Sequence, residues 1–281
     1  MIRVDAHHHV WRLSRDDYGW LTPDLPIHRD YTIDDLRPLL GDITATVLVQ
    51  AAPTEAETAY LLDVARNSSG LVRAVVGWVD LIRHDAPARI ASLAGQPLLK
   101  GLRPMLQDIA ETGWILREGI QPAIKAIVDA GLRFDALVQP RHLPALTRLC
   151  ALHQDLQLVV DHGGKPAIAS GDWQPWADDI ARVARETQAL CKLSGLITEA
   201  GRDWCLNDLG RYVDHLLVCF GTDRVMWGSD WPVVNLAGGY ARWREAAERL
   251  LAHLPGAERD AILGGNALKF YNISGVSLTD S

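Results

Sequence analysis

The chain has 281 residues, of which 48% are hydrophobic, and its 28 basic and 35 acidic side chains give a formal net charge of −7. This length and apolar content suffice to bury the core of one large globular domain. Because no basic run stands out and no stretch of about 18 apolar residues exists to span a bilayer, we expect neither a nucleic-acid partner nor a membrane partner.

The cysteines form no Cys-x-x-Cys motif and suggest no pairing. They stand at Cys150, Cys191, Cys205 and Cys219. We therefore expect free thiols in a reducing compartment. The N-terminus also shows no basic segment followed by an apolar one, so the sequence predicts a cytoplasmic protein.

The first predicted strand ends in a cluster of histidines. The stretch from Val4 to Trp11 reads Val-Asp-Ala-His-His-His-Val-Trp. Because side chains alternate between the two faces of a strand, we expect Asp5, His7 and His9 on one face and His8 on the other. Two imidazoles on one face are able to share a metal ion or a substrate oxygen.

Strand-like and helix-like segments alternate along the rest of the chain. A polar segment at about 12–31 comes first, too long for an ordinary connection and typical of a functional loop. The further predicted strands are 44–49, 71–79, 98–102, 133–138, 156–160, 189–193 and 224–227. The predicted helices are 32–40, 54–67, 86–93, 121–130, 143–153, 173–187, 204–220, 240–253 and a last one between Pro255 and Tyr271. Thr32 with Asp35, and Thr54 with Glu57, resemble capping boxes.

Strict alternation of strands and helices predicts a parallel sheet. Eight such units in a chain of 281 residues fit a (β/α)8 TIM barrel of the α/β class. We expect residues 1–281 to form one barrel domain with an extended loop at about 12–31 and a C-terminal helix. A doubly wound open sheet is the alternative, but no Gly-x-Gly-x-x-Gly follows the first strand.

Polar residues stand at the C-terminal ends of the predicted strands, where the active sites of such barrels lie. They are His7, His9, Gln50, Asp80, Arg103, Gln139, His162, Lys192 and Asp230. We expect Asp80 to cap a helix and Lys192 to form a structural ion pair. We assign substrate contacts to Gln50, Arg103 and Gln139, and the reactive centre to His7, His9, His162 and Asp230.

Three imidazoles and one carboxylate permit two kinds of chemistry. His7, His9, His162 and Asp230 are able to bind one Zn²⁺ tetrahedrally. Without metal, Asp230 would act as general base toward water, while His162 orients that water or protonates the leaving oxygen. His7, His9 or Arg103 would then polarise the attacked carbonyl. Both alternatives predict hydrolysis at a carbonyl.

Several longer motifs resemble the sugar-lactonase branch of the amidohydrolase superfamily. They are Asp5-x-His7-x-His9, Lys100-Gly-Leu-Arg103, Val160-Asp-His-Gly-Gly-Lys-Pro166, Cys191-Lys-Leu-Ser-Gly195, Phe220-Gly-Thr-Asp-Arg-Val-Met-Trp-Gly-Ser-Asp-Trp-Pro232 and Asn266-Ala-Leu-Lys-Phe-Tyr271. The branch includes lactonases for L-fuconolactone, L-rhamnonolactone and 2-pyrone-4,6-dicarboxylate. The resemblance covers nearly the whole chain and implies an amidohydrolase-like barrel.

The resemblance implies that His7, His9, His162 and Asp230 are catalytic, with Asp230 as the base. Binuclear members of the superfamily use a carboxylated Lys on the fourth strand and a His on the fifth. Arg103 and Gln139 end those strands here, which argues against two metals. Lactonases of this branch can act without a divalent metal, so we expect no required cofactor and at most one optional ion such as zinc.

The substrate is expected to be a neutral ring. A dicarboxylate would need several guanidinium groups, and only Arg103, joined by Arg141, is well placed. Two strand-end glutamines suit a polyhydroxylated sugar lactone, with a 1,4 or a 1,5 ring, and aromatic walls suit it as well. These walls are assigned to Trp20, Trp78 and Trp231. Arg103 would contact the lactone carbonyl or the carboxylate as it forms.

The expected reaction yields the free aldonic acid, and the expected partner is this small molecule; the sequence leaves the oligomeric state open. The alternatives are a metal-dependent decarboxylase of an aromatic acid and a non-catalytic sugar-acid binding protein. No sequence feature favours the binding protein, since the candidate base and its histidines are all present.

Overall fold

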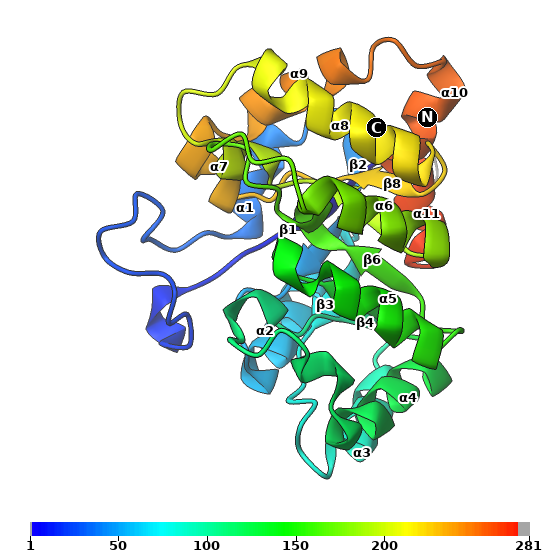
Figure 1. The fold of residues 1–281 in the computed structure, drawn as a ribbon. Helices are drawn as coiled ribbons and strands as arrows, with labels where there is room; N and C mark the ends of the chain where they lie inside the picture. Colours follow the sequence, from blue (N-terminus) through cyan, green and yellow to red (C-terminus); the bar gives the residue numbers. More distant parts are fainter. Residues whose placement is uncertain (1, 275–281) are drawn as a thin grey trace.

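A parallel sheet rolled into a barrel forms the centre of the computed structural model, which describes residues 2–274 (Figure 1). Its eight strands follow one another in chain order, from β1 to β8. The strands are β1 (Arg3–His8), β2 (Ile43–Val49), β3 (Val72–Gly77), β4 (Leu99–Leu102), β5 (Arg133–Ala136), β6 (Leu158–Val160), β7 (Leu190–Leu193) and β8 (Val225–Trp227). The predicted (β/α)8 barrel is therefore confirmed.

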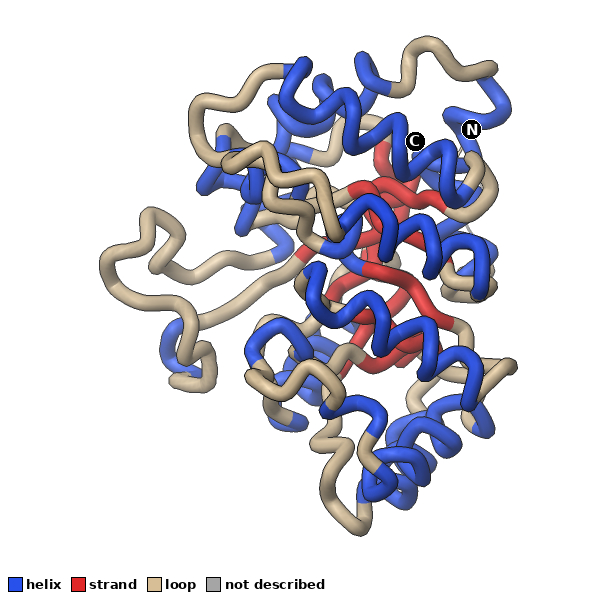
Figure 2. Tube along the Cα trace, in the orientation of Figure 1, coloured by secondary structure: helices blue, strands red, loops and turns tan. Residues whose placement is uncertain are grey.

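Helices surround the strands on the outside of the barrel (Figure 2). They are α1 (Ile33–Leu36), α2 (Glu55–Arg66), α3 (Ala86–Ala94), α4 (Gln121–Asp129), α5 (Leu143–Leu152), α6 (Trp176–Glu186), α7 (Leu196–Ala200), α8 (Leu206–Phe220), α9 (Tyr240–Leu250), α10 (Gly256–Asp260) and α11 (Asn266–Phe270). The short helix α7 was not predicted. Within residues 2–274, no helix combines the length and the apolar character needed to cross a membrane.

The barrel closes where the chain after β8 meets the end of β1. Asp230 N donates to His7 O at 2.7 Å, and His9 N donates to Trp231 O at 2.6 Å. An isolated parallel bridge joins His8 to Trp231. Closure thus places Asp230 directly beside the histidines of the first strand, although more than 200 residues separate them in the sequence.

The C-terminal segment fills one end of the barrel interior. The predicted helix is present as α10, a π-helical turn at Ala261–Gly265 and α11. Phe270 and Tyr271 pack against small and branched residues from the barrel strands, including Val4, Val47 and Val159. One end of the barrel is therefore a packed core, and the polar strand ends gather at the other.

The long loop predicted at about 12–31 is present and contains one short 3-10 turn (Leu13–Arg15). Trp11 and Tyr31 exchange two backbone hydrogen bonds of 3.0 Å across its base. Further along the loop, Trp20 Nε1 donates to Ala51 O at 2.8 Å, which ties the loop to the connection after β2. In Figure 1 it is the blue excursion at the left.

One of the two predicted capping boxes is wrong in detail. Asp35 accepts from Thr32 N, as a capping box requires. Thr54 Oγ1 accepts from Glu57 N, but the buried Glu57 carboxylate accepts from Ala51 N and Ala52 N instead of reaching back to Thr54. Burial raises the pKa of Glu57 to about 7. This carboxylate therefore shapes the β2–α2 connection to which Trp20 is hydrogen-bonded.

Gly264 allows the C-terminal segment to pass close to the first strand. A Cβ at this position would lie 2.3 Å from Ile2 O. We expect Gly264→Ala to lower the free energy of unfolding by about 1–3 kcal/mol, because backbone must move to relieve the overlap. Urea unfolding followed by circular dichroism measures this. Gly210→Ala, where a Cβ in α8 meets nothing within 4 Å, is the control and should not destabilise; equal losses would contradict the argument.

Candidate active site

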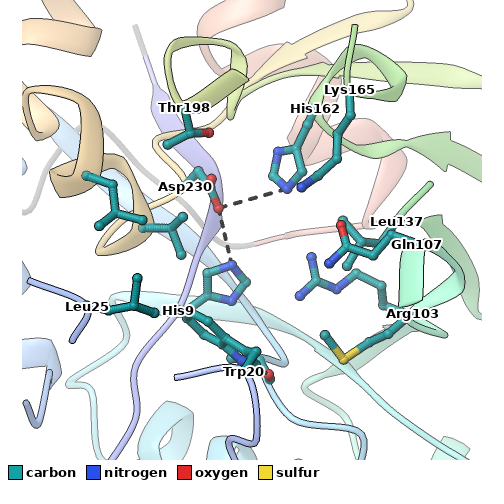
Figure 3. A pocket seen from close by; sticks show the side chains of 14 residues that line it. His9, Trp20, Leu25, Arg103, Gln107, Leu137, His162, Lys165, Thr198 and Asp230 are labelled. Carbon is teal, nitrogen blue, oxygen red and sulfur yellow. Dashed lines mark hydrogen bonds and ion pairs between the residues drawn. The ribbon is translucent and has the colours of Figure 1, made fainter. Parts of the chain in front are cut away.

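The four residues predicted to form the reactive centre come together at the closure seam, where the chain after β8 is hydrogen-bonded to the end of β1. His9 Nε2 lies 3.3 Å from Asp230 Oδ1, and His7 Nε2 lies 3.6 Å from the same oxygen. His162 Nε2 approaches that oxygen to 3.9 Å. All four side chains are almost completely buried. One carboxylate oxygen is thus surrounded by three imidazoles, as Figure 3 shows for His9 and His162.

The expectation that Asp5 shares a face with His7 and His9 is not met. The register of β1 against β2 is irregular between Asp5 and His8, and this breaks the strict alternation. Asp5 accepts from Ser229 N at 2.8 Å, and Tyr240 of the outer helix α9 lies near its carboxyl group. Burial raises the pKa of Asp5 to about 6. Asp5 therefore stabilises the closure seam by binding the backbone of the segment after β8.

The hydrogen bonds of His9 and His7 assign their protons. His9 Nδ1 lies 2.8 Å from Val49 O, which can only accept, so Nδ1 carries the proton and Nε2 is bare. His7 Nε2 lies 3.2 Å from this bare nitrogen. On the other side of His7, the Lys192 ammonium lies 3.1 Å from Nδ1 and donates to it. His7 is therefore the tautomer with its proton on Nε2, facing the site.

A buried charge network lies beneath His7, and it was missing from the sequence prediction apart from Lys192. Lys192 Nζ lies 2.5 Å from Asp135 Oδ2 and 3.0 Å from Asp161 Oδ1. Tyr271 OH donates to Asp135 at 2.6 Å. The predicted structural role of Lys192 is consistent with these contacts, but the lysine also reaches a site histidine. Asp135 lies within β5 and Asp161 directly follows β6, so the sequence does not show that both pair with Lys192.

Arg103 borders the site from the end of β4. Its Nη1 lies 3.3 Å from Asp161 Oδ2, and its Nη2 donates to Gln50 O. Burial would raise the pKa of Asp161, but Lys192, His7 and Arg103 together hold it well below its usual value. The Arg103 charge is therefore already balanced by a buried carboxylate.

His162 stands on a left-handed turn. His162, Gly163, Gly164 and Lys165 have φ of 54°, 60°, 73° and 52°, and Lys165 N donates to His162 O at 2.9 Å. The left-handed region costs a residue with a Cβ about 1–2 kcal/mol. The Gly-Gly pair lowers this cost, and the two residues that still bear it are those whose side chains point into the site.

The charge states of His162 and Asp230 favour a base beside a neutral histidine. Burial lowers the pKa of His162 to about 4. Burial would raise the pKa of Asp230, but its imidazole neighbours, His162 foremost, hold it well below its usual value. Asp230 is therefore a carboxylate near neutral pH. Ser194 Oγ lies 2.9 Å from His162 Nδ1 and fixes the ring.

A cavity of about 240 Å³ opens over this cluster (Figure 3). Its lining residues are His9, Trp20, Leu25, Ala51, Arg103, Met105, Gln107, Leu137, His162, Lys165, Thr198, Asp230, Val233 and Leu236. In Figure 3, Lys165, Gln107 and Arg103 lie on one side of Asp230, and Leu25 lies on the other. The polar members Gln107, Lys165 and Thr198 were missed because Gln107 and Lys165 lie beyond the ends of β4 and β6 and Thr198 lies on the unpredicted helix α7.

The residues predicted to contact substrate separate into two groups. Arg103 and Trp20 line the cavity. Gln50 lies behind Arg103, with its Nε2 donating to Arg103 O at 2.7 Å. The other three are not among the lining residues. Gln139 accepts from Arg141, Trp78 N donates to Thr58 Oγ1, and the buried Trp231 packs edge-on against Tyr31.

Asp80 lies outside the cavity lining, but it does not cap a helix as predicted, because Asp85 is the N-cap residue of α3. Asp80 Oδ1 accepts from Ile82 N at 3.3 Å in the turn that precedes α3. The structure thus brings the four predicted reactive residues together, whereas only Arg103 and Trp20 of the six predicted substrate contacts line the cavity.

One ion fits the separations of the ligand atoms. His7 Nε2, His9 Nε2 and Asp230 Oδ1 lie 3.2, 3.3 and 3.6 Å apart, and ligand atoms around tetrahedral zinc are separated by roughly 3.3 Å. His9 already presents a bare nitrogen. His7 does not, because a metal on Nε2 would require its proton to move to Nδ1, against the Lys192 ammonium. The donor set is therefore suited to an ion, while the hydrogen bonds oppose one at His7.

A parallel eight-stranded barrel with these histidines and an aspartate at its strand ends has the architecture of the amidohydrolases. The amidohydrolase family profile matches residues 4–273. The chain belongs to this family, and the resemblance found in the sequence is confirmed.

Relatives within the family make the similarity more specific. The chain is 46% identical over 278 residues to the L-fucono-1,5-lactonase of Burkholderia ambifaria, covering 96% of each chain. It is 37% identical over 291 residues to the L-fucono-1,5-lactonase of Burkholderia multivorans, again covering 96% of each. A solved amidohydrolase structure from Burkholderia multivorans with bound zinc superposes with a TM-score of 0.91 at 36% identity, covering 98% of this chain and 100% of that one.

Ser194 should matter for activity through His162. We expect Ser194→Ala to lower kcat about three- to tenfold on a sugar lactone, the effect of losing one neutral hydrogen bond. KM should change less, because the mutated group does not line the cavity. Steady-state kinetics test this, with the exposed Ser170→Ala as control; an unchanged kcat would show that the hydroxyl does not orient His162.

Proposed function

We propose that this protein hydrolyses the 1,5-lactone of a sugar acid such as L-fuconic acid to the free aldonic acid. The observation that carries the proposal is the ionised Asp230 carboxylate, held among three imidazoles below a cavity of about 240 Å³, in a chain that shares 46% identity with an L-fucono-1,5-lactonase. A cavity of this volume suits one sugar ring rather than a polymer.

Asp230 is proposed as the base that takes a proton from water. The water oxygen attacks the lactone carbonyl carbon, and the carbonyl oxygen takes up the negative charge. The His7 Nε2 proton and Arg103 are proposed to polarise this oxygen, since Arg103 Nη1 lies 3.4 Å from His7 Nε2 and both groups are donors. His9, with a bare Nε2, and His162 orient the water.

Asp230 also serves the second half of the reaction. Once protonated, it is the acid that gives its proton to the ring oxygen as the carbon–oxygen bond breaks. His162, whose pKa is about 4, is neutral near pH 7 and is not the proton donor. The carboxylic acid that forms then releases one proton to solvent.

A metal ion is proposed to be optional. His7, His9, His162 and Asp230 would hold it, and such an ion would lower the pKa of a bound water and polarise a carbonyl. Asp230 alone supplies a base, and the Lys192 contact keeps the His7 proton where metal would bind. This favours hydrolysis over the alternative of a metal-dependent aromatic acid decarboxylase.

The four free cysteines favour a cytoplasmic location.

The base assignment predicts a large loss in Asp230→Asn. Asn matches Asp in shape and tolerates the left-handed conformation of position 230, where φ is 58°. We expect kcat/KM for L-fucono-1,5-lactone to fall about 10²–10⁴-fold, the usual contribution of a positioned general base. Proton release in weak buffer measures the rate after subtraction of the spontaneous reaction. Activity within a few fold of the wild type would reject Asp230 as base.

The optional metal predicts that turnover survives chelation. We expect prolonged dialysis against a strong chelator to leave kcat/KM within about twofold, a change smaller than the loss of one neutral hydrogen bond. Metal content is measured by mass spectrometry on the same samples. Loss of activity that zinc restores would instead establish a required ion at His7, His9 and Asp230.

A further inference from the structure

The reaction creates negative charge, and the cavity offers few cations to receive it. Lactone plus water gives a hydroxy acid that ionises, so charge appears first on the carbonyl oxygen and then on the carboxylate. Among the described residues that line the cavity, the permanent cations are Arg103 and Lys165. Arg103 already forms an ion pair with the Asp161 carboxylate and donates a hydrogen bond to Gln50 O. Lys192 is fully buried between two carboxylates and does not line the cavity.

Lys165 differs from these two cations in its surroundings. Its Nζ pairs with Glu199 Oε1 at 3.3 Å, and the two side chains are 25% and 27% exposed. A partly exposed pair of this kind is weak and exchangeable. In Figure 3 the Lys165 side chain runs alongside His162 on the cavity side, and the lysine charge acts on the pKa of His162. Lys165 is therefore a charge that substrate can recruit.

The backbone of Lys165 is a second, independent observation. Lys165 ends the left-handed turn with φ of 52°, a conformation that a lysine rarely adopts. The turn leaves little room for alternatives, because a Cβ at Gly163 would lie 3.0 Å from Leu216 and one at Gly164 would lie 3.1 Å from Leu143. Strained backbone of this kind is found where side chains must be aimed at a functional site. Here it aims His162 and Lys165 at one cavity.

We propose that Lys165 is a catalytic residue that leaves Glu199 to bind the negative charge of the substrate, first on the oxyanion and then on the aldonate carboxylate. The proposal rests on the lactonase function proposed above. Its ammonium group donates a charge-assisted hydrogen bond and exchanges no proton, so the reaction balance is unchanged. Glu199 pairs with Lys165 and neutralises its charge while the cavity is empty.

The proposal separates charged from neutral ligands of the same shape. We expect Lys165→Met to weaken binding of the aldonate product roughly ten- to a hundredfold, the range for a hydrogen bond to a charged group. Binding of the neutral 1,5-anhydroalditol, which lacks the carbonyl oxygen, should change less than about twofold, below the effect of one neutral hydrogen bond. The value of kcat/KM for the lactone should fall together with aldonate affinity, and Lys165→Arg should restore part of both.

Two variants control for a merely structural role. Glu199→Gln removes the same ion pair but leaves the lysine free, so it should bind aldonate at least as tightly as the wild type. Lys125→Met removes an exposed lysine paired with Asp129 outside the cavity and should change nothing. Equal losses in Lys165→Met and Glu199→Gln would mean that the pair only anchors α7, and would overturn the proposal.

Calorimetric titration of aldonate and anhydroalditol into all four variants and the wild type is the deciding experiment. A selective loss of aldonate binding in Lys165→Met supports the proposal. Unchanged aldonate binding in Lys165→Met, with an active wild type, overturns it while leaving the lactonase function intact. A wild type that hydrolyses no sugar lactone and binds no aldonate rejects the proposed function itself.

Discussion

The Lys192 ammonium is the group on which the site depends most. Removing a charge from water is costly unless it is paired, and Lys192 donates to Asp135 and His7 and forms an ion pair with Asp161. Tyr271 adds a hydrogen bond to Asp135 from the C-terminal segment. The packed core and the catalytic cluster are thus joined through one cation, and the proton position on His7 follows from the same contact.

Barrel closure supplies the second constraint. Asp230 reaches the histidines because its own N–H bonds to the backbone of His7, and Trp231 O accepts from His9. The base and two of its neighbours are therefore positioned by main-chain bonds, which are less easily distorted than side-chain contacts. Catalysis by a fixed carboxylate needs this rigidity, because a base that drifts loses its reach to water.

The cations in and beneath the cavity differ in how firmly neighbouring carboxylates neutralise them. Lys192 is enclosed, Arg103 is balanced by a buried carboxylate, and Lys165 is paired in a partly exposed position. A neutral lactone enters and an anion leaves, so a cavity that held a strong free cation would retain its product. An exchangeable cation offers charge when the reaction needs it and returns to Glu199 afterwards.

The sequence by itself determined the alternation of strands and helices, the barrel and the candidate set of His7, His9, His162 and Asp230 that the fold brings together, because apolar periodicity and strand-end position are local properties. Only the tertiary structure decided that the Asp5 carboxylate accepts from the backbone of His7 and Ser229. It also decided that Gln50, Gln139, Trp78 and Trp231 do not line the cavity and that Lys165 does. A register irregularity reverses a face, and loops beyond strand ends take directions that depend on packing between distant segments. Asp135 lies within β5 and Asp161 directly follows β6, so it is the side-by-side packing of β5, β6 and β7 that brings both carboxylates to Lys192.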